Sequence, residues 1–345
     1  MQAKVDAVKI SFSPIIFQVT CTLLKLGILD LIAEHGEQGI PAEDIAKKLN
    51  ISLYGIKVLL DVALNHKLIW LKAENCILDK IGYFILTDSM IRTNLDFIQD
   101  VCYQGLFYLT DSIKNSAPEG LKVFGDWKTI YPALHELPEP AKASWFKFDH
   151  YYSDQTFAEV LPIIFSKPVK HIFDVGGNTG KFALQCLNFD PAVNITILDL
   201  PQQIDKIENI MDANGFRHRC SGFAIDLLNP DLKLPKGADT VFMSQFLDCF
   251  SEPQILSILQ RTAQSMSKDT RLYVLDLFWD RQEYEAAAYS LNCISIYFTC
   301  MANGRSRMYH SKDIIKLIHQ AGLYIDEDID HVGAWHTLLC CKIKS

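Results

Sequence analysis

The sequence predicts an α/β protein in which a mostly helical amino-terminal region precedes a parallel sheet covered by helices on both faces. Three observations carry this prediction. From about residue 161 onward, short apolar segments typical of strands alternate with helical segments, and this order is typical of a parallel sheet. A glycine-rich turn follows the first of these strands, at residues 176–180. Residues 1–110 lack the alternation and are predicted mostly as helices.

Length and composition bound the class of protein. The chain has 345 residues, of which 49% are hydrophobic, enough for one large or two smaller buried cores. We expect a helical domain at residues 1–110, an aromatic connecting segment at 111–160 and a cofactor-binding catalytic domain at 161–345. A formal net charge of −8 argues against nucleic acid as the main partner, because phosphate binding needs clustered basic residues.

The cysteines and the amino terminus indicate a compartment. Ten cysteines extend from Cys21 to Cys341 without a CxxC pair, which predicts reduced thiols, no metal site and a cytoplasmic location. The apolar run Ile15–Leu24 is interrupted by polar residues and no small-residue cleavage site follows it. We therefore expect no stretch that is long and apolar enough to span a bilayer, and no membrane partner.

The amino-terminal region shows a winged-helix pattern. Helices are predicted at Ile40–Leu49 and Leu53–Asn65, with Ser52 capping the second, and two strands at Ile69–Leu71 and Ile77–Leu86 form the wing. Basic residues are sparse on and just after the second helix, where Lys57 and Lys67 stand among apolar residues. This favours a structural or dimer-forming module over DNA binding.

The rest of the chain is predicted as follows. The segment from Pro118 to Asp154 is loop-rich and aromatic, and its rings are expected to pack between domains. The strands of the parallel sheet and of an edge hairpin are expected at His171–Val175, Asn194–Leu198, Thr240–Met243, Arg271–Leu275, Tyr324–Ile329 and His336–Ile343.

The glycine turn points to one kind of cofactor. A P-loop is excluded because Phe182 follows Gly180-Lys181, and a dinucleotide fingerprint fails because Asn178 and Lys181 stand where it needs glycines. Asp174 ends the strand before the turn. A carboxylate there would repel a pyrophosphate but suits an ammonium or a sulfonium group. S-adenosylmethionine carries both.

Two further acids follow successive strands. Asp199 ends the second strand, where a carboxylate can accept hydrogen bonds from both ribose hydroxyls of a nucleoside. Asp226 follows the next strand, where it could contact the adenine amino group. Three acids at successive strand ends, together with the glycine turn, predict an S-adenosylmethionine site.

The segments Asp174–Gly180 and Asp199-Leu200-Pro201, after a winged helix, resemble the small-molecule O-methyltransferase family of caffeate, flavonoid, hydroxyindole and antibiotic-tailoring enzymes. Phe148–Asp154 and Gly304–Arg307 are similar to further family segments. The resemblance covers nearly the whole chain, although Asn178 replaces a family glycine. It implies a Rossmann-like class I methyltransferase domain behind a winged-helix dimerisation domain. Carried over residue by residue, the cofactor contacts are expected at Asp174, Gly176, Gly177, Gly180, Asp199, Leu200, Asp226, Leu227, Ser153 and Ser244.

The family also implies a homodimer, in which the helical amino-terminal domains interlock and help to wall the substrate pocket of the partner. The catalytic residues of this chain differ from the usual family pattern. Family members use a His as general base and two glutamates that orient it. On that alignment this chain has Asp248 in the place of the His, Asp276 in the place of the first Glu and Ser306 in the place of the second.

Several chemistries are compatible with this loss. Asp248 is itself a candidate base, with a pKa raised by burial and by Asp276. His150 or His310 could instead supply an imidazole. An ionised oxygen, an amine or an activated carbon needs no strong base. Relatives that bind the cofactor but decarboxylate, hydroxylate or close rings, and a winged-helix regulator that senses a ligand, are the alternatives to the first hypothesis: O-methylation of a small aromatic metabolite.

Overall fold

The computed structural model describes residues 1–333 and 335–344. The chain divides into two compact units, Met1–Asp100 and Val101–Ser345. Each has its own hydrophobic core, one in the first unit and two clusters in the second. The expected division into three parts at residues 110 and 160 stays a prediction about domains.

The first unit is a winged helix with additional helices. Its strands form a three-stranded sheet in the order β1-β3-β2. The Ser52 hydroxyl accepts a hydrogen bond from the Gly55 backbone N–H at 3.1 Å, which confirms the predicted helix cap. The elements are α1 Gln2–Lys25, α2 Ile28–Glu34, β1 Ile40–Pro41, α3 Ala42–Leu49, α4 Leu53–Asn65, β2 Ile69–Lys72, β3 Asn75–Leu78, α5 Lys80–Thr87 and α6 Ser89–Phe97.

The second strand of the predicted wing was too long. The chain leaves β3 at Leu78, and the Asp79 carboxylate accepts a hydrogen bond from the Lys80 backbone N–H at 2.7 Å to begin α5. Ile85 and Leu86 pack against the core of the first unit from this helix. A short run of apolar residues does not distinguish a strand from a helix by periodicity, and the cap at Asp79 decided the outcome.

The expectation that no stretch could span a bilayer was also wrong. Helix α1 is long and apolar enough to cross a membrane by length and composition, a test that core helices and signal sequences also pass. The scattered polar residues do not outweigh the apolar ones over a full helix. Large apolar side chains exposed along α1 are Val5, Val8, Ile10, Phe12 and Ile15.

The second unit contains a seven-stranded sheet in the order β6-β5-β4-β7-β8-β10-β9. Strands β4 to β8 are parallel, whereas β10 runs antiparallel to both β8 and β9. The elements are α7 Leu109–Asn115, α8 Ala141–Ile164, β4 His171–Val175, α9 Lys181–Phe189, β5 Asn194–Asp199, α10 Pro201–Ala213, β6 Cys220–Ala224, β7 Thr240–Ser244, α11 Glu252–Ser265, β8 Arg271–Asp276, α12 Glu285–Tyr297, α13 Ser311–Gln320, β9 Leu323–Val332 and β10 His336–Ile343.

This sheet confirms the predicted strands and the edge hairpin of β9 and β10. The two units also contain short helical turns, of which Leu247–Cys249 carries Asp248 to the end of β7. They are the 3₁₀ helices Gly36–Gln38, Gly105–Tyr108, Glu119–Val123, Tyr131–Glu136, Leu247–Cys249 and Trp279–Arg281, and the π-helical turns Ile98–Cys102 and Phe298–Ala302.

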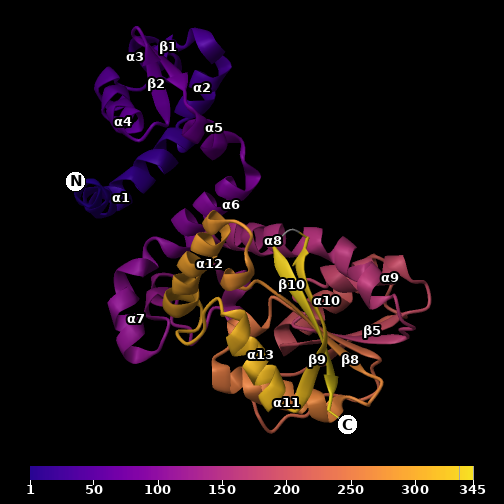
Figure 1. The fold of residues 1–345 in the computed structure, drawn as a ribbon. Helices are drawn as coiled ribbons and strands as arrows, with labels where there is room; N and C mark the ends of the chain where they lie inside the picture. The colour runs from indigo at the N-terminus through magenta and orange to yellow at the C-terminus, as the bar shows by residue number, and fades with distance from the viewer. Residues whose placement is uncertain (334, 345) are drawn as a thin grey trace. The chain divides into compact units, whose positions relative to one another are not determined.

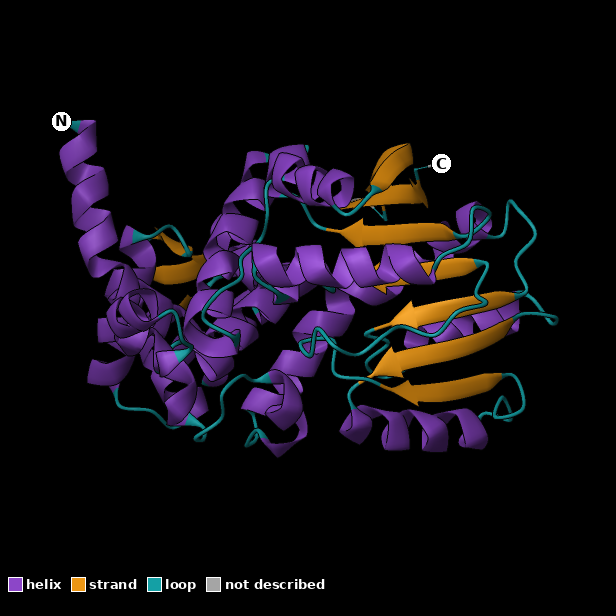
Figure 2. Ribbon diagram, turned by 90° about the horizontal axis from the view of Figure 1, so that it is seen from below, coloured by secondary structure: helices purple, strands orange, loops and turns teal. Residues whose placement is uncertain are grey.

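Helices cover both faces of the seven-stranded sheet, as Figures 1 and 2 show. On one face, Phe173 and Val241 pack with α11 and α13. On the other, Ile172 and Phe242 pack with α8, α9 and α10. Neighbouring residues of one strand face opposite sides. Because both sides are buried, the strands are apolar throughout, which explains why they were readily predicted.

The aromatic segment is more regular than expected. Residues 118–140 do contain short turns, but α8 begins at Ala141 and continues to Ile164. The prediction of loops up to Asp154 was therefore wrong for its second half. Phe157 and Val160 of this helix bury against the sheet, and this tertiary packing outweighs the weak helix propensity of its many aromatic residues.

Candidate active site

The site lies where the carboxyl ends of β4, β5, β7 and β8 meet. Strand β4 is the first in the sheet, yet it pairs with β5 on one side and β7 on the other. The chain order therefore reverses between β4 and β7. In open α/β sheets, ligands bind in the crevice outside the strand ends at such a switch point.

The glycine turn after β4 needs its glycines for conformation and for space. Gly176 and Gly180 have φ of 73° and 74°, a region that favours glycine. A Cβ atom on Gly176 would lie 2.4 Å from the Phe246 ring, and one on Gly177 would lie 2.8 Å from Asp174 Oδ2. Asn178 has φ of 49°, which asparagine tolerates better than most residues. The turn thus exposes backbone close to Asp174.

The Asp199 carboxylate organises this turn. One of its oxygens accepts a hydrogen bond from the Asn178 backbone N–H at 3.0 Å, and the other accepts one from the Leu200 backbone N–H at 2.7 Å. Burial raises the pKa of Asp199 to about 6, while these two N–H donors oppose the rise. Leu200 itself precedes α10 and contributes its backbone.

Asp174 is buried below the turn with an oxygen that lacks a partner. Only 3% of the residue is exposed, and Oδ2 makes no hydrogen bond within the described residues. Burial and, to a smaller extent, the neighbouring Asp199 raise the pKa of Asp174 to about 8. A buried acceptor without a donor is unfavourable. A cationic or hydrogen-bond-donating ligand would relieve it.

Other unsatisfied polar atoms lie at the end of the neighbouring strand. Ser244 Oγ ends β7, Gln245 Nε2 follows it, and Asp248 Oδ1 comes three residues later; all three are buried without a hydrogen-bond partner in the described part of the chain. Gln245 has φ of 45°, a strained conformation of the kind that clusters at functional sites. Together with Asp174, this edge offers both donors and acceptors to a polar ligand.

Asp226 and Leu227 occupy the end beyond β6. Asp226 is exposed, and its Oδ1 accepts a hydrogen bond from the Leu228 backbone N–H at 2.9 Å. The Leu227 side chain packs in the hydrophobic core, and its carbonyl accepts a hydrogen bond from Arg261 at 2.6 Å. The backbone around Asp226 is thus well held, and a role of either residue toward a cofactor stays a prediction.

Helix α8 contacts the glycine turn through two pairs. The Asn178 side chain donates a hydrogen bond to Asp149 at 3.0 Å, and Lys181 forms an ion pair with Asp154. The contact with Asn178 lowers the pKa of Asp149, but burial dominates and raises it. Ser153 donates to the Asp149 carbonyl at 3.1 Å and to Asp154 at 3.2 Å. The Ser153 hydroxyl is thus engaged within its own helix.

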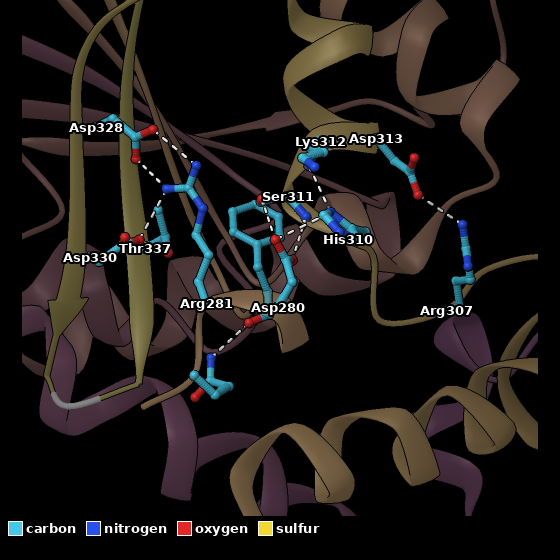
Figure 3. A network of polar contacts seen from close by, with 12 residues as sticks. Asp280, Arg281, Arg307, His310, Ser311, Lys312, Asp313, Asp328, Asp330 and Thr337 are labelled. Carbon is cyan, nitrogen blue, oxygen red and sulfur yellow. Dashed lines mark hydrogen bonds and ion pairs between the residues drawn. The ribbon is translucent and has the colours of Figure 1, made fainter. Parts of the chain in front are cut away.

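Within the described part of the chain, neither histidine candidate makes a hydrogen bond or an ion pair with Asp248. The His150 ring stacks on Phe146, and its Nδ1 lies 3.4 Å from Asp154. The His310 Nδ1 lies 3.2 Å from Asp280 and also accepts a hydrogen bond from the Lys312 backbone N–H that begins α13, as Figure 3 shows. His310 therefore caps the start of α13 close to Asp280, which gives it a structural role.

Asp248 and Asp276 form a buried pair of acids. They are 5% and 2% exposed. Burial, and to a smaller extent Asp149, raises the pKa of Asp248 to about 7. Burial and then Asp248 raise the pKa of Asp276 well above its ordinary value, although its Oδ1 accepts a hydrogen bond from the Leu277 backbone N–H at 2.8 Å. At neutral pH the pair therefore holds protons that exposed carboxyls would have lost.

Ser306 belongs to a neighbouring cluster that sequence reasoning missed. The Asn303 Nδ2 atom lies within hydrogen-bonding distance of three oxygens, Ser306 Oγ at 2.7 Å, the Cys249 carbonyl at 3.0 Å and Tyr131 Oη at 3.1 Å. Asn303 and Cys249 each adjoin a predicted site residue or motif, but no local spacing connects them to Tyr131. Only the folded chain brings these segments, and Asp149 of α8, to one place.

Two family models match the sequence. The Dimerisation2-like domain matches residues 4–75, and the O-methyltransferase domain matches residues 108–324. The mitomycin biosynthesis 6-O-methyltransferase of Streptomyces lavendulae is 24% identical over 45% of this chain and 42% of its own length. The acetylserotonin O-methyltransferase of Gallus gallus is 25% identical over 55% of this chain and 57% of its own. The matched region thus spans about half the length of these curated relatives.

Solved structures share the fold over nearly the whole chain. The S-adenosylmethionine-dependent methyltransferase SibL has a TM-score of 0.73 at 20% identity, covering 98% of each chain. Human N-acetylserotonin methyltransferase, solved in complex with S-adenosylmethionine, has a TM-score of 0.68 at 16% identity and covers 100% of this chain and 99% of its own. The fold is that of a Rossmann-like class I methyltransferase. With its matching domain covering most of the chain, this protein belongs to the O-methyltransferase domain family.

Proposed function

We propose that this protein is an S-adenosylmethionine-dependent methyltransferase that methylates a hydroxyl group of a small aromatic metabolite, with Asp248 in the role usually held by a histidine. The observation that carries the proposal is the buried, unpartnered Oδ1 of Asp248 at the same strand edge as the glycine turn. Membership of the O-methyltransferase domain family supports the reaction class.

The residues at the turn fit the cofactor. Asp199 would hold the ribose hydroxyls, and the unpartnered Asp174 Oδ2 would face a cationic or donor group of the amino acid part. Gly176 and Gly177 allow the backbone of the turn to lie against Phe246 and Asp174, because a side chain at Gly176 would collide with Phe246 and one at Gly177 with Asp174. Bound there, S-adenosylmethionine supplies an electrophilic methyl group on a sulfonium. The raised pKa of Asp174 favours a ligand that brings positive charge.

The protein's own contribution to the reaction is to position the acceptor, exclude water and receive one proton. When the acceptor oxygen is methylated, Asp248 would receive the proton that the hydroxyl group loses. A pKa of about 7 suits a base that works near neutral pH. The burial of Asp276 and the charge of Asp248 would keep Asp276 protonated while Asp248 acts as the base.

A second candidate is methyl transfer to a carbon or a nitrogen at the same site. A named relative favours it: the L-tyrosine C(3)-methyltransferase of Streptomyces lavendulae is 21% identical over 54% of this chain and 50% of its own length. An activated carbon places less demand on a base, and this chain lacks the usual histidine. Non-methylating chemistry and ligand sensing remain further alternatives without an observation in their favour.

We further propose a homodimer built through the first unit, in a cytoplasmic protein. The Dimerisation2-like match to residues 4–75 supports the dimer. So does the row of exposed apolar side chains on α1 that includes Ile10 and Phe12, because a soluble monomer rarely leaves such a surface uncovered.

The full-length purified protein tests the function directly. S-adenosylhomocysteine should bind in calorimetry, and S-adenosylmethionine with a panel of phenols should yield S-adenosylhomocysteine and a methylated product whose position is read by mass spectrometry and NMR. The Asp248→Asn variant should keep S-adenosylhomocysteine binding and lose O-methylation by about 10²-fold or more. Asp269→Asn, on an exposed turn, is the matched control.

Three outcomes would contradict the proposal. If S-adenosylhomocysteine neither binds nor stabilises the protein, the cofactor is wrong. If Asp248→Asn methylates hydroxyls as fast as the wild type across pH, Asp248 is not the base. If the product carries its methyl group on carbon or nitrogen, the second candidate replaces the first.

A further inference from the structure

The connection between β6 and β7, which carries Asp226 and Leu227, contains neither a helix nor a strand. Strand β6 ends at Ala224, and β7 begins at Thr240. In a parallel sheet such a connection is usually a helix, whose carbonyl groups are paired along the helix itself. The carbonyl groups of this irregular connection therefore need hydrogen-bond donors from another part of the chain.

Arg261 of α11 supplies these donors. Its Nη2 donates to the Leu227 carbonyl at 2.6 Å, and its Nη1 donates to the carbonyls of Asn229 at 3.1 Å and Leu232 at 3.0 Å. Its Nε donates to the Ser257 carbonyl of its own helix at 3.3 Å. All three nitrogens of the guanidinium are thus engaged, and two of them hold one short stretch of the connection.

The Arg261 guanidinium is buried beside this stretch. The residue is 8% exposed. Burial lowers the pKa of Arg261, and the charge of Asp226 opposes the decrease. A buried cation is unfavourable unless hydrogen bonds compensate for the lost water. Arginine suits this position because its planar fork directs several donors at once, which the compact ammonium group of a lysine does not.

The stretch that Arg261 holds also fixes the backbone and the carboxylate of Asp226. The Leu228 backbone N–H donates to Asp226 Oδ1 at 2.9 Å, and the Asn229 backbone N–H donates to the Asp226 carbonyl at 3.1 Å. Leu227 packs in the hydrophobic cluster that also contains residues of α11. Because Asp226 itself is exposed, the position of its carboxylate depends on this support.

We propose that Arg261 is a positioning residue that holds the loop 226–232 and thereby keeps Asp226 at the adenine end of the cofactor site, where its carboxylate selects an amino group over a carbonyl oxygen. An adenine amino group can donate to the carboxylate, whereas a carbonyl oxygen in the same place would be repelled by it. The effect on the ligand rests on the proposed function, whereas the effect on the loop does not.

Hydrogen exchange in the full, unliganded chain tests the effect on the loop. Arg261→Lys keeps the charge but loses the fork, so the backbone N–H groups of Leu228 and Asn229 should exchange faster than in the wild type by about tenfold. Arg261→Gln, a neutral side chain that keeps two N–H donors, should change the exchange in the same direction. NMR on the full chain measures both variants.

Arg219 provides a matched control because it holds a different connection in the same manner. Its side chain donates to the carbonyls of Leu187, Asp190 and Val193 at 2.8 Å, 2.9 Å and 3.2 Å. These residues precede β5, at the amino ends of the parallel strands and thus at the edge opposite the site. Arg219→Lys should lower the melting temperature and leave hydrogen exchange in the loop 226–232 unchanged.

Two ligands test the effect on specificity: S-adenosylhomocysteine, and S-inosylhomocysteine, in which a carbonyl oxygen replaces the adenine amino group. The wild type should prefer the first in calorimetry. Arg261→Lys should reduce the ratio of the two affinities by about tenfold, because a hydrogen bond to a charged group is weakened. Asp226→Asn should remove the preference, since its amide can also donate to the carbonyl oxygen. Arg219→Lys should keep the preference.

A merely structural role of Arg261 would lower the melting temperature of Arg261→Lys without a change in the exchange of the loop or in the affinity ratio, and that result would overturn the proposal. So would a wild type that binds both ligands equally well. If the wild type does not bind S-adenosylhomocysteine, the proposed function fails and the adenine contact fails with it, while hydrogen exchange still decides whether Arg261 holds the loop.

Discussion

The two ends of the site, at β4–β5 and at β7–β8, are built in different ways. At the β4–β5 end, Asp199 holds the turn at Asn178 through backbone N–H groups, within one strand–turn–helix unit. At the β7–β8 end, the residue after Asp248 is held by Asn303, which lies within hydrogen-bonding distance of the Cys249 carbonyl and of Tyr131, both far from it in the chain. Both ends bury carboxyl groups. Backbone N–H groups donate to both oxygens of Asp199 at the first end, whereas Asp248 Oδ1 at the second has no partner among the described residues.

The sequence resembles the family pattern at the first end and is expected to depart from it at the second, and the two kinds of construction fit that expectation. Backbone donors depend on the conformation of the turn, so the acid and the glycines must be kept together. A side-chain cluster can be rebuilt when several contributors change at once. We therefore expect substitutions at the β4–β5 end to affect cofactor binding, and those at the β7–β8 end to affect proton transfer and stability.

The largest effect is expected for Asp199→Asn. The amide keeps the size of the side chain but loses the charge and one of the two oxygens that accept from the Asn178 and Leu200 backbone N–H groups, and the ribose hydroxyls proposed to bind there would lose a charged partner. S-adenosylhomocysteine binding should weaken by about 100-fold or more, since a hydrogen bond to a charged group contributes about 1.5–3 kcal/mol. Calorimetry measures it, with Asp226→Asn as the comparison at a more exposed acid. Unchanged affinity would place the nucleoside elsewhere.

Gly176→Ala should come next. Alanine at this position must adopt φ of 73°, and its Cβ atom would lie 2.4 Å from the Phe246 ring. We expect a loss of about 2–3 kcal/mol in the free energy of unfolding, together with weaker S-adenosylhomocysteine binding. Gly215→Ala is the control, because it has a similar φ of 76° in open space and should lose only about 1 kcal/mol. Equal losses in the two variants would show that strain alone, and not crowding at the turn, matters.

Asp276→Asn should act through pH. The folded pKa of Asp276 lies well above its ordinary value, so the folded protein holds a proton that the unfolded chain releases. Its contribution is favourable below the unfolded pKa and is lost as pH rises toward the folded pKa. The variant should therefore be more stable than the wild type at pH 8 and show little difference at about pH 4. Urea unfolding at both pH values measures this gain, and a variant that is less stable at pH 8 would contradict the raised pKa.

Asn178→Gly should have the smallest effect. It keeps the backbone N–H that donates to Asp199 and suits the positive φ of 49°, but it loses the side-chain bond to Asp149. We expect a change of less than about 1 kcal/mol in stability and little change in S-adenosylhomocysteine affinity. A loss of affinity as large as that of Asp199→Asn would mean that the contact with α8 holds the turn, and the two ends would then not be separate.

The sequence alone determined the parts of this protein that short-range rules control. Both faces of the parallel strands are buried, so each is a continuous apolar run, and the glycine turn with Asp174 and Asp199 lies within 26 residues of chain. The fold class, the strands and the position of the cofactor edge follow from these patterns. The end of β3 and the start of α8 did not, because a helix cap and tertiary packing decided between equally apolar alternatives.

Only the tertiary structure decided how the β7–β8 end is built. Asp248 and Asp276 were found by alignment to a pattern that they do not fulfil, and Ser306 was assigned to the same role although its hydroxyl contacts Asn303. Tyr131, Cys249 and Asn303 are brought together from three segments. No local period or spacing encodes such a cluster, because side chains separated by many residues meet only when the sheet and its covering helices pack.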